Sequence, residues 1–398
     1  MNLLRYLLFF PSATFSIYTA EVFPYGILYA LTVIRKISIY LILIFIFFGF
    51  SIIYGIYRYG VIDYFEILRS LFAYLNPLLV FYVLCKVSGS VIDKFDKILK
   101  KLFIFFVILG ILQLSGILSP LNFIFDFIVP RASSTSLGFR GVTLISTEPA
   151  RAGIELLFIY FYIRRFHIKP GNRIFSDILA FIYVIFVFKS ASVLFVYLLF
   201  IALIYYRKSI VFIPIISTAA VLTISFSDGR AAVLIRDIFS LPFEDAIWLI
   251  TNTSGNRVIS IYSSLNYGLH NFFGGGIGAW KHSSVEALNL TGINYSDLNY
   301  FRNALAERGG YFFRSSGYFM NLLMDTGYIG CLAVFSFIYR TTRIIRKKRQ
   351  ILNKDDTPFY LVFIFNILIV GSVGAPVPWV VTALYLRHYI KNKSDRKI

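Results

Sequence analysis

Long apolar runs recur through almost the whole of the 398-residue chain, and they limit the possible folds more than any other feature. The long runs have about 15 to 24 residues, and a helix needs roughly 20 apolar residues to cross a bilayer. Only 15% of the residues are charged, against about 25% in an average globular chain, which excludes a soluble multidomain protein. The runs also lack the alternation of a membrane barrel. The sequence therefore predicts an all-α, polytopic transmembrane protein.

The chain reads as a single polytopic membrane domain over residues 1–398. The eleven predicted spans are 6–34, 37–56, 65–86, 102–119, 150–164, 175–188, 190–206, 209–226, 317–339, 358–374 and 376–390. Pro11, Glu21 and Pro24 interrupt the first stretch, which therefore also fits a hairpin of two short helices, and the total would then be twelve.

Basic residues are concentrated in alternate connections between the predicted spans. Six segments hold 25 Lys and Arg residues against 5 Asp and Glu residues: 35–36, 86–101, 164–173, 207–208, 340–356 and 387–397. Basic connections lie on the cytoplasmic side of multispanning proteins. The net charge of +19 is therefore a topology signal, and we expect no nucleic-acid partner.

Two connections on the opposite side are long enough to carry chemistry. They are a first large periplasmic loop at 120–149 and a second, largest one at 227–316. In the second loop seven basic residues are balanced by seven acidic ones. Long loops in compact proteins are usually functional. Within this loop, 233–239 and 258–265 are expected to form short helices and 252–256 a turn or helix cap.

The chain offers few residues for a disulfide or a metal site. Cys85 and Cys331 lie within or at the edge of apolar runs, which supports neither a disulfide framework nor a cysteine metal site. The outer loops show no metal-ligand spacing, so we expect no metal and no cofactor. The N-terminal residues read as part of the first membrane element rather than a removed signal peptide.

The first candidate site lies where the first outer loop enters the span at 150–164. Thr147 or Ser146 could cap that helix, and Pro149 suits its first turn. Glu148, Arg151 and Glu155 are spaced i, i+3 and i+7, so they share one helix face. Charged groups at this depth normally face a bundle interior or a water-filled cavity. The alternative is a ladder of charges that only neutralise one another.

The second candidate site combines Arg257 with a glycine run in the largest loop. Gly274, Gly275, Gly276 and Gly278 would let the backbone approach a ligand closely, and arginine suits bidentate contact with phosphate. The run lacks the lysine and hydroxyl residue of a P-loop, so a plain turn is an equal alternative.

Further polar residues of the largest loop are candidates for substrate binding. Arg314 precedes the span at 317–339, where it could bind substrate or anchor the helix at the lipid headgroups. The largest loop contains two histidines, His270 and His282. We assign His270 to substrate binding; the alternative is that it is a solvated loop residue without a function.

The layout and three local patterns resemble the Wzy-type O-antigen polymerases, within the group that includes O-antigen ligases. The patterns are Glu148-Pro149, then Gly255-Asn256-Arg257 followed by Gly-Gly-Gly-Ile-Gly at 274–278, and Ser-Ser-Gly-Tyr-Phe-Met-Asn-Leu-Leu at 315–323 with Gly-Tyr-Ile-Gly downstream. They cover roughly residues 135–340, and topology alone carries the rest.

The resemblance implies a metal-independent glycosyltransferase with a GT-C-like fold in the bacterial inner membrane. Its substrate would be an undecaprenyl-diphosphate-linked oligosaccharide, joined to another lipid-linked repeat unit on the periplasmic face. Family members rely on periplasmic arginines, which correspond here to Arg140 or Arg151 and to Arg257. A polysaccharide chain-length regulator is the implied protein partner.

The residue chemistry agrees with this expectation. Guanidinium groups can stabilise a leaving diphosphate without a metal, and a carboxylate can accept or orient an acceptor hydroxyl. We therefore assign the diphosphate to Arg257 with Arg140 or Arg151, and the acceptor to Glu148.

Two other functions remain as alternatives. One is a ligase that transfers polymer to lipid A core, although ligases carry a histidine where this chain has Ser315-Ser316. The other is a polysaccharide flippase or transporter, although no repeated halves are evident in the sequence.

Overall fold

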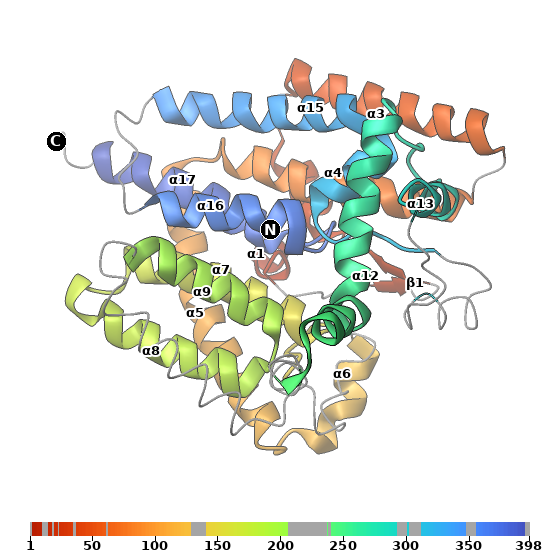
Figure 1. Ribbon diagram of the computed structural model, residues 1–398. Helices are drawn as coiled ribbons and strands as arrows, with labels where there is room; N and C mark the ends of the chain where they lie inside the picture. Colours follow the sequence, from red (N-terminus) through yellow and green to blue (C-terminus); the bar gives the residue numbers. More distant parts are fainter. Residues whose placement is uncertain are drawn as a thin grey trace.

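Helices make up nearly all of the regular structure in the computed structural model (Figure 1). It describes residues 2–9, 15–17, 20–22, 24–34, 37–60, 63–128, 141–205, 237, 240–292, 301, 312–347 and 356–394. The elements used below are α1 (Asn2–Leu7), β1 (Phe15–Ile17), β2 (Ala20–Val22), α2 (Tyr25–Val33), α3 (Ile39–Tyr59), α4 (Tyr64–Leu84), α5 (Gly89–Leu114), η1 (Ser119–Leu121), α6 (Asn122–Ile128), α7 (Pro149–Phe166), η3 (Pro170–Asn172), α8 (Arg173–Tyr183), η4 (Val184–Phe188), α9 (Ala191–Tyr205), α12 (Phe243–His270), α13 (Trp280–Asn289), α15 (Tyr318–Lys347), α16 (Thr357–Phe365), η8 (Asn366–Val370) and α17 (Val377–Ser394).

Four described helices are long and apolar enough to cross a membrane. They are Ile39–Tyr59, Tyr64–Leu84, Pro170–Phe188 and Tyr318–Arg343. A fifth candidate is the pair Gly89–Leu114 and Ser119–Asp126, which is bent by 105°. The described chain therefore has the helices of a membrane protein, although fewer of them reach full span length than the eleven apolar runs suggested, and the run at 209–226 lies outside the described residues.

The first apolar stretch, 6–34, is not one continuous helix. It contains α1, then the antiparallel hairpin of β1 and β2 with Phe15 opposite Val22, and then α2. Pro24 stands directly before α2, at its N-cap, where a missing backbone N–H costs little. Two short helices are therefore present, as the hairpin alternative expected, and the strands between them were not predicted.

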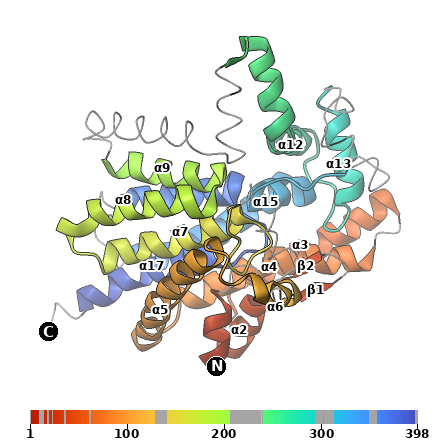
Figure 2. The ribbon, with the colours of Figure 1, turned by 90° about the horizontal axis from the view of Figure 1, so that it is seen from below.

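Two groups of helices meet at α17 (Figures 1 and 2). In one group α15 packs against α3, α4 and α12, and α4 also packs against α2. In the other group α7 packs against α5 and α9, and α9 packs against α8 and α16. Because α17 contacts both α4 and α7, it joins the two groups.

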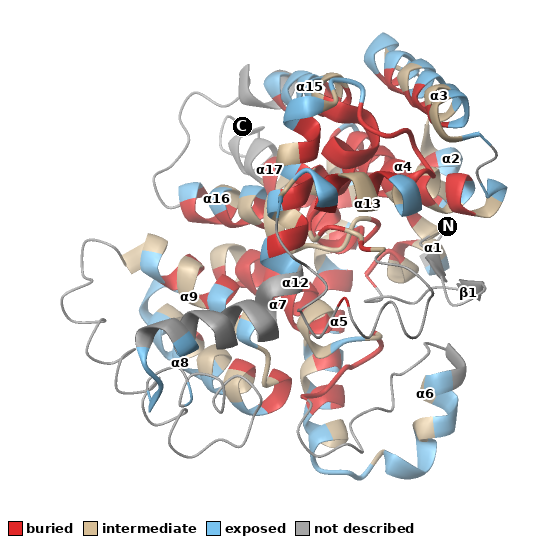
Figure 3. Ribbon diagram, turned by 45° about the vertical axis from the view of Figure 1, so that its right-hand side comes forward, coloured by how far each residue is buried: buried red, intermediate tan, exposed pale blue. Residues whose placement is uncertain are grey.

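Burial separates central from peripheral helices (Figure 3). Helix α7 is buried without interruption over 152–164 and α17 over 377–386. In the most apolar stretch of α4, 67% of the residues are buried, against 28% in that of α3. Large apolar side chains of α3, α5 and α8 are exposed, among them Ile46, Ile104 and Phe175. Such surfaces suit contact with lipid chains.

Helix α12 takes the place of the short helix expected at 258–265 and of the turn expected at 252–256, whereas the short helix expected at 233–239 lies outside the described residues except at 237. Helix α12 runs for 28 residues, and 252–256 lie inside it, so the prediction of a turn there is wrong. Contact with α15 explains the difference, because tertiary packing overrides the weak helix propensity of Asn, Ser and Gly. Ile259 and Tyr267 of α12 form a small core with Met324 of α15.

Candidate functional site

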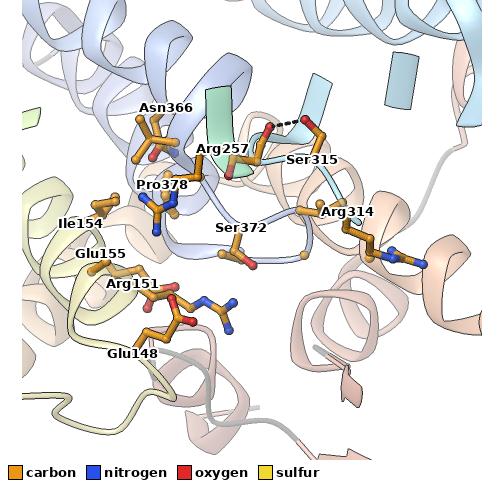
Figure 4. Close-up of a pocket in the computed structure, with 18 of the residues that line it drawn as sticks. Glu148, Arg151, Ile154, Glu155, Arg257, Arg314, Ser315, Asn366, Ser372 and Pro378 are labelled. Atoms are coloured by element: carbon orange, nitrogen blue, oxygen red, sulfur yellow. Dashed lines mark hydrogen bonds between the residues drawn. The ribbon is translucent and has the colours of Figure 1, made fainter. Parts of the chain in front are cut away.

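One cavity of about 290 Å³ gathers polar side chains from five separate parts of the chain (Figure 4). Its lining lies on α4, at the start of α7, on α12, in the segment before α15, and between η8 and α17. The charged and amide side chains among the lining residues are Arg69, Glu148, Arg151, Glu155, Arg257, Arg314 and Asn366. The structure thus brings together five of the charged residues singled out in the sequence: Glu148, Arg151, Glu155, Arg257 and Arg314.

Helix α7 begins at Pro149, as the sequence predicts, with a different residue at its cap. The N-cap is Glu148, whose backbone is extended, and its carboxylate makes no capping hydrogen bond in the described structure. The expectation that Thr147 or Ser146 caps the helix is therefore wrong. Thr147 instead accepts a hydrogen bond of 3.2 Å from Nη1 of Arg151 one turn later. Glu148 is exposed and lines the cavity.

The three charged residues of the predicted stripe all line the cavity. Glu148 is exposed, Arg151 is half-buried, and Glu155 has only 1% of its surface exposed. Helical spacing places them on one face, which here points inward (Figure 4). All three charges therefore lie on the cavity wall, and Arg151 is the charged group that acts on the Glu155 carboxylate, so mutual neutralisation of these two remains an alternative.

Arg257 reaches the cavity from α12. Its Nη1 donates a hydrogen bond of 2.6 Å to Oγ of Ser192, at the start of α9. The Arg257 residue is exposed within the described part of the chain. Although 106 positions separate Arg151 from Arg257 in the sequence, both line the same cavity.

Arg314 and Arg69 line the cavity beside a shared carboxylate. Nη2 of Arg314 donates to Oγ of Ser70 at 2.8 Å and lies 3.5 Å from Oε2 of Glu66. Nη1 of Arg69 lies 3.4 Å from the same Glu66 oxygen. The Arg314 guanidinium also lies 4.9 Å from the ring centre of Trp280. These contacts hold it away from Arg151 (Figure 4), and among the described residues its buried Nε has no hydrogen-bond partner.

A break between η8 and α17 supplies the remaining wall, which sequence reasoning missed. Gly371 and Gly374 lie in this non-helical segment, at the end of the span predicted over 358–374, so the prediction of a continuous helix there is wrong. The Gly371 carbonyl accepts from the Gly317 amide at 3.0 Å, and the Gly374 carbonyl accepts from Nδ2 of Asn76 at 3.0 Å. The two glycines and Pro376 inside an apolar stretch were the signal that could have revealed it.

The glycine run does not line this cavity. The Gly275 amide donates to the Met324 carbonyl at 2.9 Å, and the Gly276 amide donates to the Asp325 carbonyl at 2.7 Å. A Cβ on Gly278 would lie 2.6 Å from a side-chain carbon of Ile67. The run packs against helices, and two of its amides are already engaged, so the structure gives it a packing role, as it does at Gly274 beside Gly327.

The two remaining candidates also lie apart from the cavity lining. His270 is exposed in the last turn of α12, and its Nδ1 is 2.8 Å from the Asn266 carbonyl oxygen. Arg140 lies outside the described residues.

The cavity suits an anion with hydroxyl groups. Four arginines and two glutamates line it, a formal excess of two positive charges. Guanidinium groups bind phosphate oxygens strongly at such partly desolvated sites. Among the described residues, no group of three or more His, Cys, Asp or Glu side chains is placed to hold a metal ion.

Comparison with known families, curated proteins and solved structures yields no match to this chain. The function must therefore be argued from the cavity itself.

Proposed function

We propose that this chain is a polymerase of O-antigen or a related surface polysaccharide. It would join undecaprenyl-diphosphate-linked oligosaccharide repeats on the periplasmic face of the bacterial inner membrane. The observation that carries the proposal is the convergence of Arg151 and Arg257 with Glu148 on one cavity. The lining residues in the first halves of α4 and α7, before α15, and between η8 and α17 lie away from the basic connections, on the outer side under the positive-inside bias.

The arginines would serve the leaving group. Transfer breaks the bond between the anomeric carbon of the donor sugar and a diphosphate oxygen, and charge accumulates on that diphosphate. Arg151 and Arg257 approach from different helices, so they can hold the diphosphate from two sides. Fixed donors of this kind stabilise developing charge most strongly where water is partly excluded. Arg69 and Arg314 add to the positive field of the cavity.

The carboxylates would serve the acceptor. A sugar hydroxyl attacks the anomeric carbon, and its proton must leave as the new bond forms. Glu148 lies at the exposed mouth, where an incoming lipid-linked repeat first meets the cavity, and it would orient that hydroxyl or accept its proton. The exposed apolar faces of the surrounding helices would contact membrane lipid and the polyprenyl tail. A chain-length regulator remains the proposed protein partner.

The proposal is tested in cells of the native host from which the chromosomal copy is deleted. We expect the deletion to leave lipid A core capped with a single repeat, and the wild-type chain to restore a polymer ladder on a gel. Loss of all capping would instead indicate a ligase or flippase.

Alanine at Arg151 or Arg257 should lower polymer formation by about 100-fold, because each removes a charge-assisted contact to the leaving group. Arg340→Ala is the matched control, because Arg340 is exposed near the opposite end of α15. It should keep the wild-type ladder. Normal ladders from both site variants, at normal protein levels in the membrane, would contradict the assignment.

A further inference from the structure

Two buried hydrogen-bond acceptors face the cavity without partners. Glu155 of α7 is 1% exposed, and among the described residues neither of its carboxylate oxygens has a hydrogen-bond partner. Asn366, the first residue of η8, is 2% exposed, and its Oδ1 is likewise without a partner. Both residues line the cavity. Buried polar groups are nearly always satisfied, so two such groups in one cavity indicate that a ligand completes them.

The backbone fixes both acceptors in place. Glu155 follows Arg151 by four residues, one turn deeper along the fully buried part of α7. Asn366 starts a π-helical turn, and its carbonyl accepts a hydrogen bond of 2.7 Å from the Gly371 amide at the far side of that turn. π-helical turns of this kind are frequent at functional sites.

The chemistry of the acceptors selects the ligand. A carboxylate and an amide oxygen both require a donor, which hydroxyl or ammonium groups could provide. The excess of positive charge on the cavity wall opposes a cationic ligand. An uncharged, hydroxyl-bearing group, such as a sugar ring, therefore fits this inner part of the cavity.

We infer that Glu155 and Asn366 form the acceptor subsite and that Glu155 is the catalytic base. This inference rests on the proposed polymerase function. The acceptor hydroxyl donates to Glu155 while a neighbouring hydroxyl donates to Oδ1 of Asn366. As the hydroxyl oxygen bonds to the anomeric carbon of the donor, its proton passes to the Glu155 carboxylate. The carbon–oxygen bond to the diphosphate breaks, and its electron pair leaves with undecaprenyl diphosphate. Glu155 then releases the proton to water.

Burial distinguishes Glu155 from Glu148. Water hydrates the exposed Glu148 carboxylate, so it needs no ligand to satisfy its oxygens. The Glu155 oxygens are shielded and gain their hydrogen bond when a hydroxyl arrives. Burial therefore assigns the acceptance of the proton to Glu155 and leaves Glu148 the orienting role.

The test measures transfer in membranes from the deletion strain that carry each variant, with lipid-linked repeats extracted from that strain as substrate. We expect Glu155→Gln to lower kcat by about 100-fold or more at an unchanged KM, as loss of a general base does. Asp245→Asn makes the same change from carboxylate to amide at an exposed position of α12 outside the cavity lining, and it should change kcat by less than about threefold. Asn366→Leu should raise KM by about tenfold, through loss of a hydrogen bond to the acceptor.

Two further measurements separate catalysis from folding. Glu155→Asp keeps a carboxylate and should retain clearly more activity than Glu155→Gln at equal protein level in the membrane. Undecaprenyl diphosphate should raise the melting temperature of purified Glu155→Gln as much as that of the wild type, because the arginines remain. Equal losses in the Asp and Gln variants, or loss of the response to undecaprenyl diphosphate, would give Glu155 a structural role and overturn the inference.

The outcomes also separate this inference from the proposed function. If the deletion strain still makes a normal polymer ladder, the polymerase proposal fails and the acceptor subsite fails with it. If the deletion abolishes the ladder and Glu155→Gln restores it fully, the polymerase proposal stands and Glu155 is not the base.

Discussion

At the scale of single residues, some buried charges have all their hydrogen bonds completed within the described protein and others do not. Away from the cavity, Arg164 and Asp177 form a buried ion pair with Nε 2.6 Å from Oδ1 and Nη2 2.8 Å from Oδ2. Tyr160 and Tyr205 also donate hydrogen bonds to the Asp177 carboxylate. Glu155, by contrast, has no such partner among the described residues. The protein itself therefore completes the hydrogen bonds of the Arg164–Asp177 pair, whereas Glu155 depends on a ligand under the proposed function.

Asp177→Asn should destabilise the protein strongly. It leaves the Arg164 guanidinium buried without a counter-charge, which typically costs about 3–5 kcal/mol. We expect a clear fall in the melting temperature of the detergent-purified protein. Lys100→Ala removes the more exposed ion pair with Asp96 and should cost less than about 1 kcal/mol. Equal melting temperatures for the two variants would refute this difference.

The sequence predicted some of the site residues and not others, for a physical reason. Helical spacing along a single segment was enough to place Glu148, Arg151 and Glu155 on one face. That face meets Arg257 and Asn366 only through the packing of α12 and η8 around the cavity, which no local pattern encodes. The sequence therefore predicts which residues share a helix face, but it does not predict which residues of other helices they meet.

At the scale of elements, the loop at 271–279 docks into a kink of α15. The kink is at Gly327, which has φ of 63° and ψ of −164°. Gly274 packs closely there, since a Cβ on it would lie 2.5 Å from the Gly327 nitrogen. Gly276 packs on α3, where a Cβ would lie 2.3 Å from Cα of Gly55. The glycine run thus connects three elements through backbone contacts that leave no room for a side chain.

Gly276→Ala should therefore destabilise the protein more than an ordinary glycine substitution. The residue has φ of +98°, and the added methyl group would meet backbone atoms of α3. The matched control is Gly292→Ala, because Gly292 has φ of +66° and no heavy atom within 4 Å of an added Cβ. The control should cost about 1–2 kcal/mol and Gly276→Ala clearly more, measured by thermal unfolding in detergent. A smaller loss for Gly276→Ala would be inconsistent with this packing.

The sequence predicted the type of most elements and misjudged some extents. Apolar runs identified α3, α4, α7 and α9 to within a few residues, because burial and lipid contact both select the same side chains. The sequence did not predict the full length of α12, because that helix depends on packing against α15.

At the scale of the whole molecule, the basic connections and most of the cavity lining lie at opposite ends of the helices. Arg165 pairs with Asp356 at 2.9 Å, and Lys100 lies 3.4 Å from Asp96, all in or beside the basic connections. The cavity lies at the other helix ends. The uneven distribution of basic residues between the connections therefore corresponds to two different ends of the described helices. Which end faces the cytoplasm is a proposal that labelling can test.

Single cysteines placed at the two ends should react from opposite sides of the membrane. Asp63 and Lys169 are both exposed, at the cavity end and the basic end respectively. Cys85 and Cys331 are buried, so background labelling should be low. In spheroplasts, a membrane-impermeant maleimide should label Asp63→Cys, and should label Lys169→Cys only after the membrane is opened. The reverse pattern would invert the proposed topology.

The position of α17 has a mechanical consequence. It contacts α4 on one side and α7 on the other, and the cavity takes its walls from both helix groups. Arg151 belongs to one group and Arg257 to the other, so the gap between the two guanidinium groups depends on how the groups tilt about α17. Bilayer thickness and lateral pressure act on that tilt from outside. We therefore expect the affinity of the cavity for a diphosphate to vary with the lipid composition of the membrane.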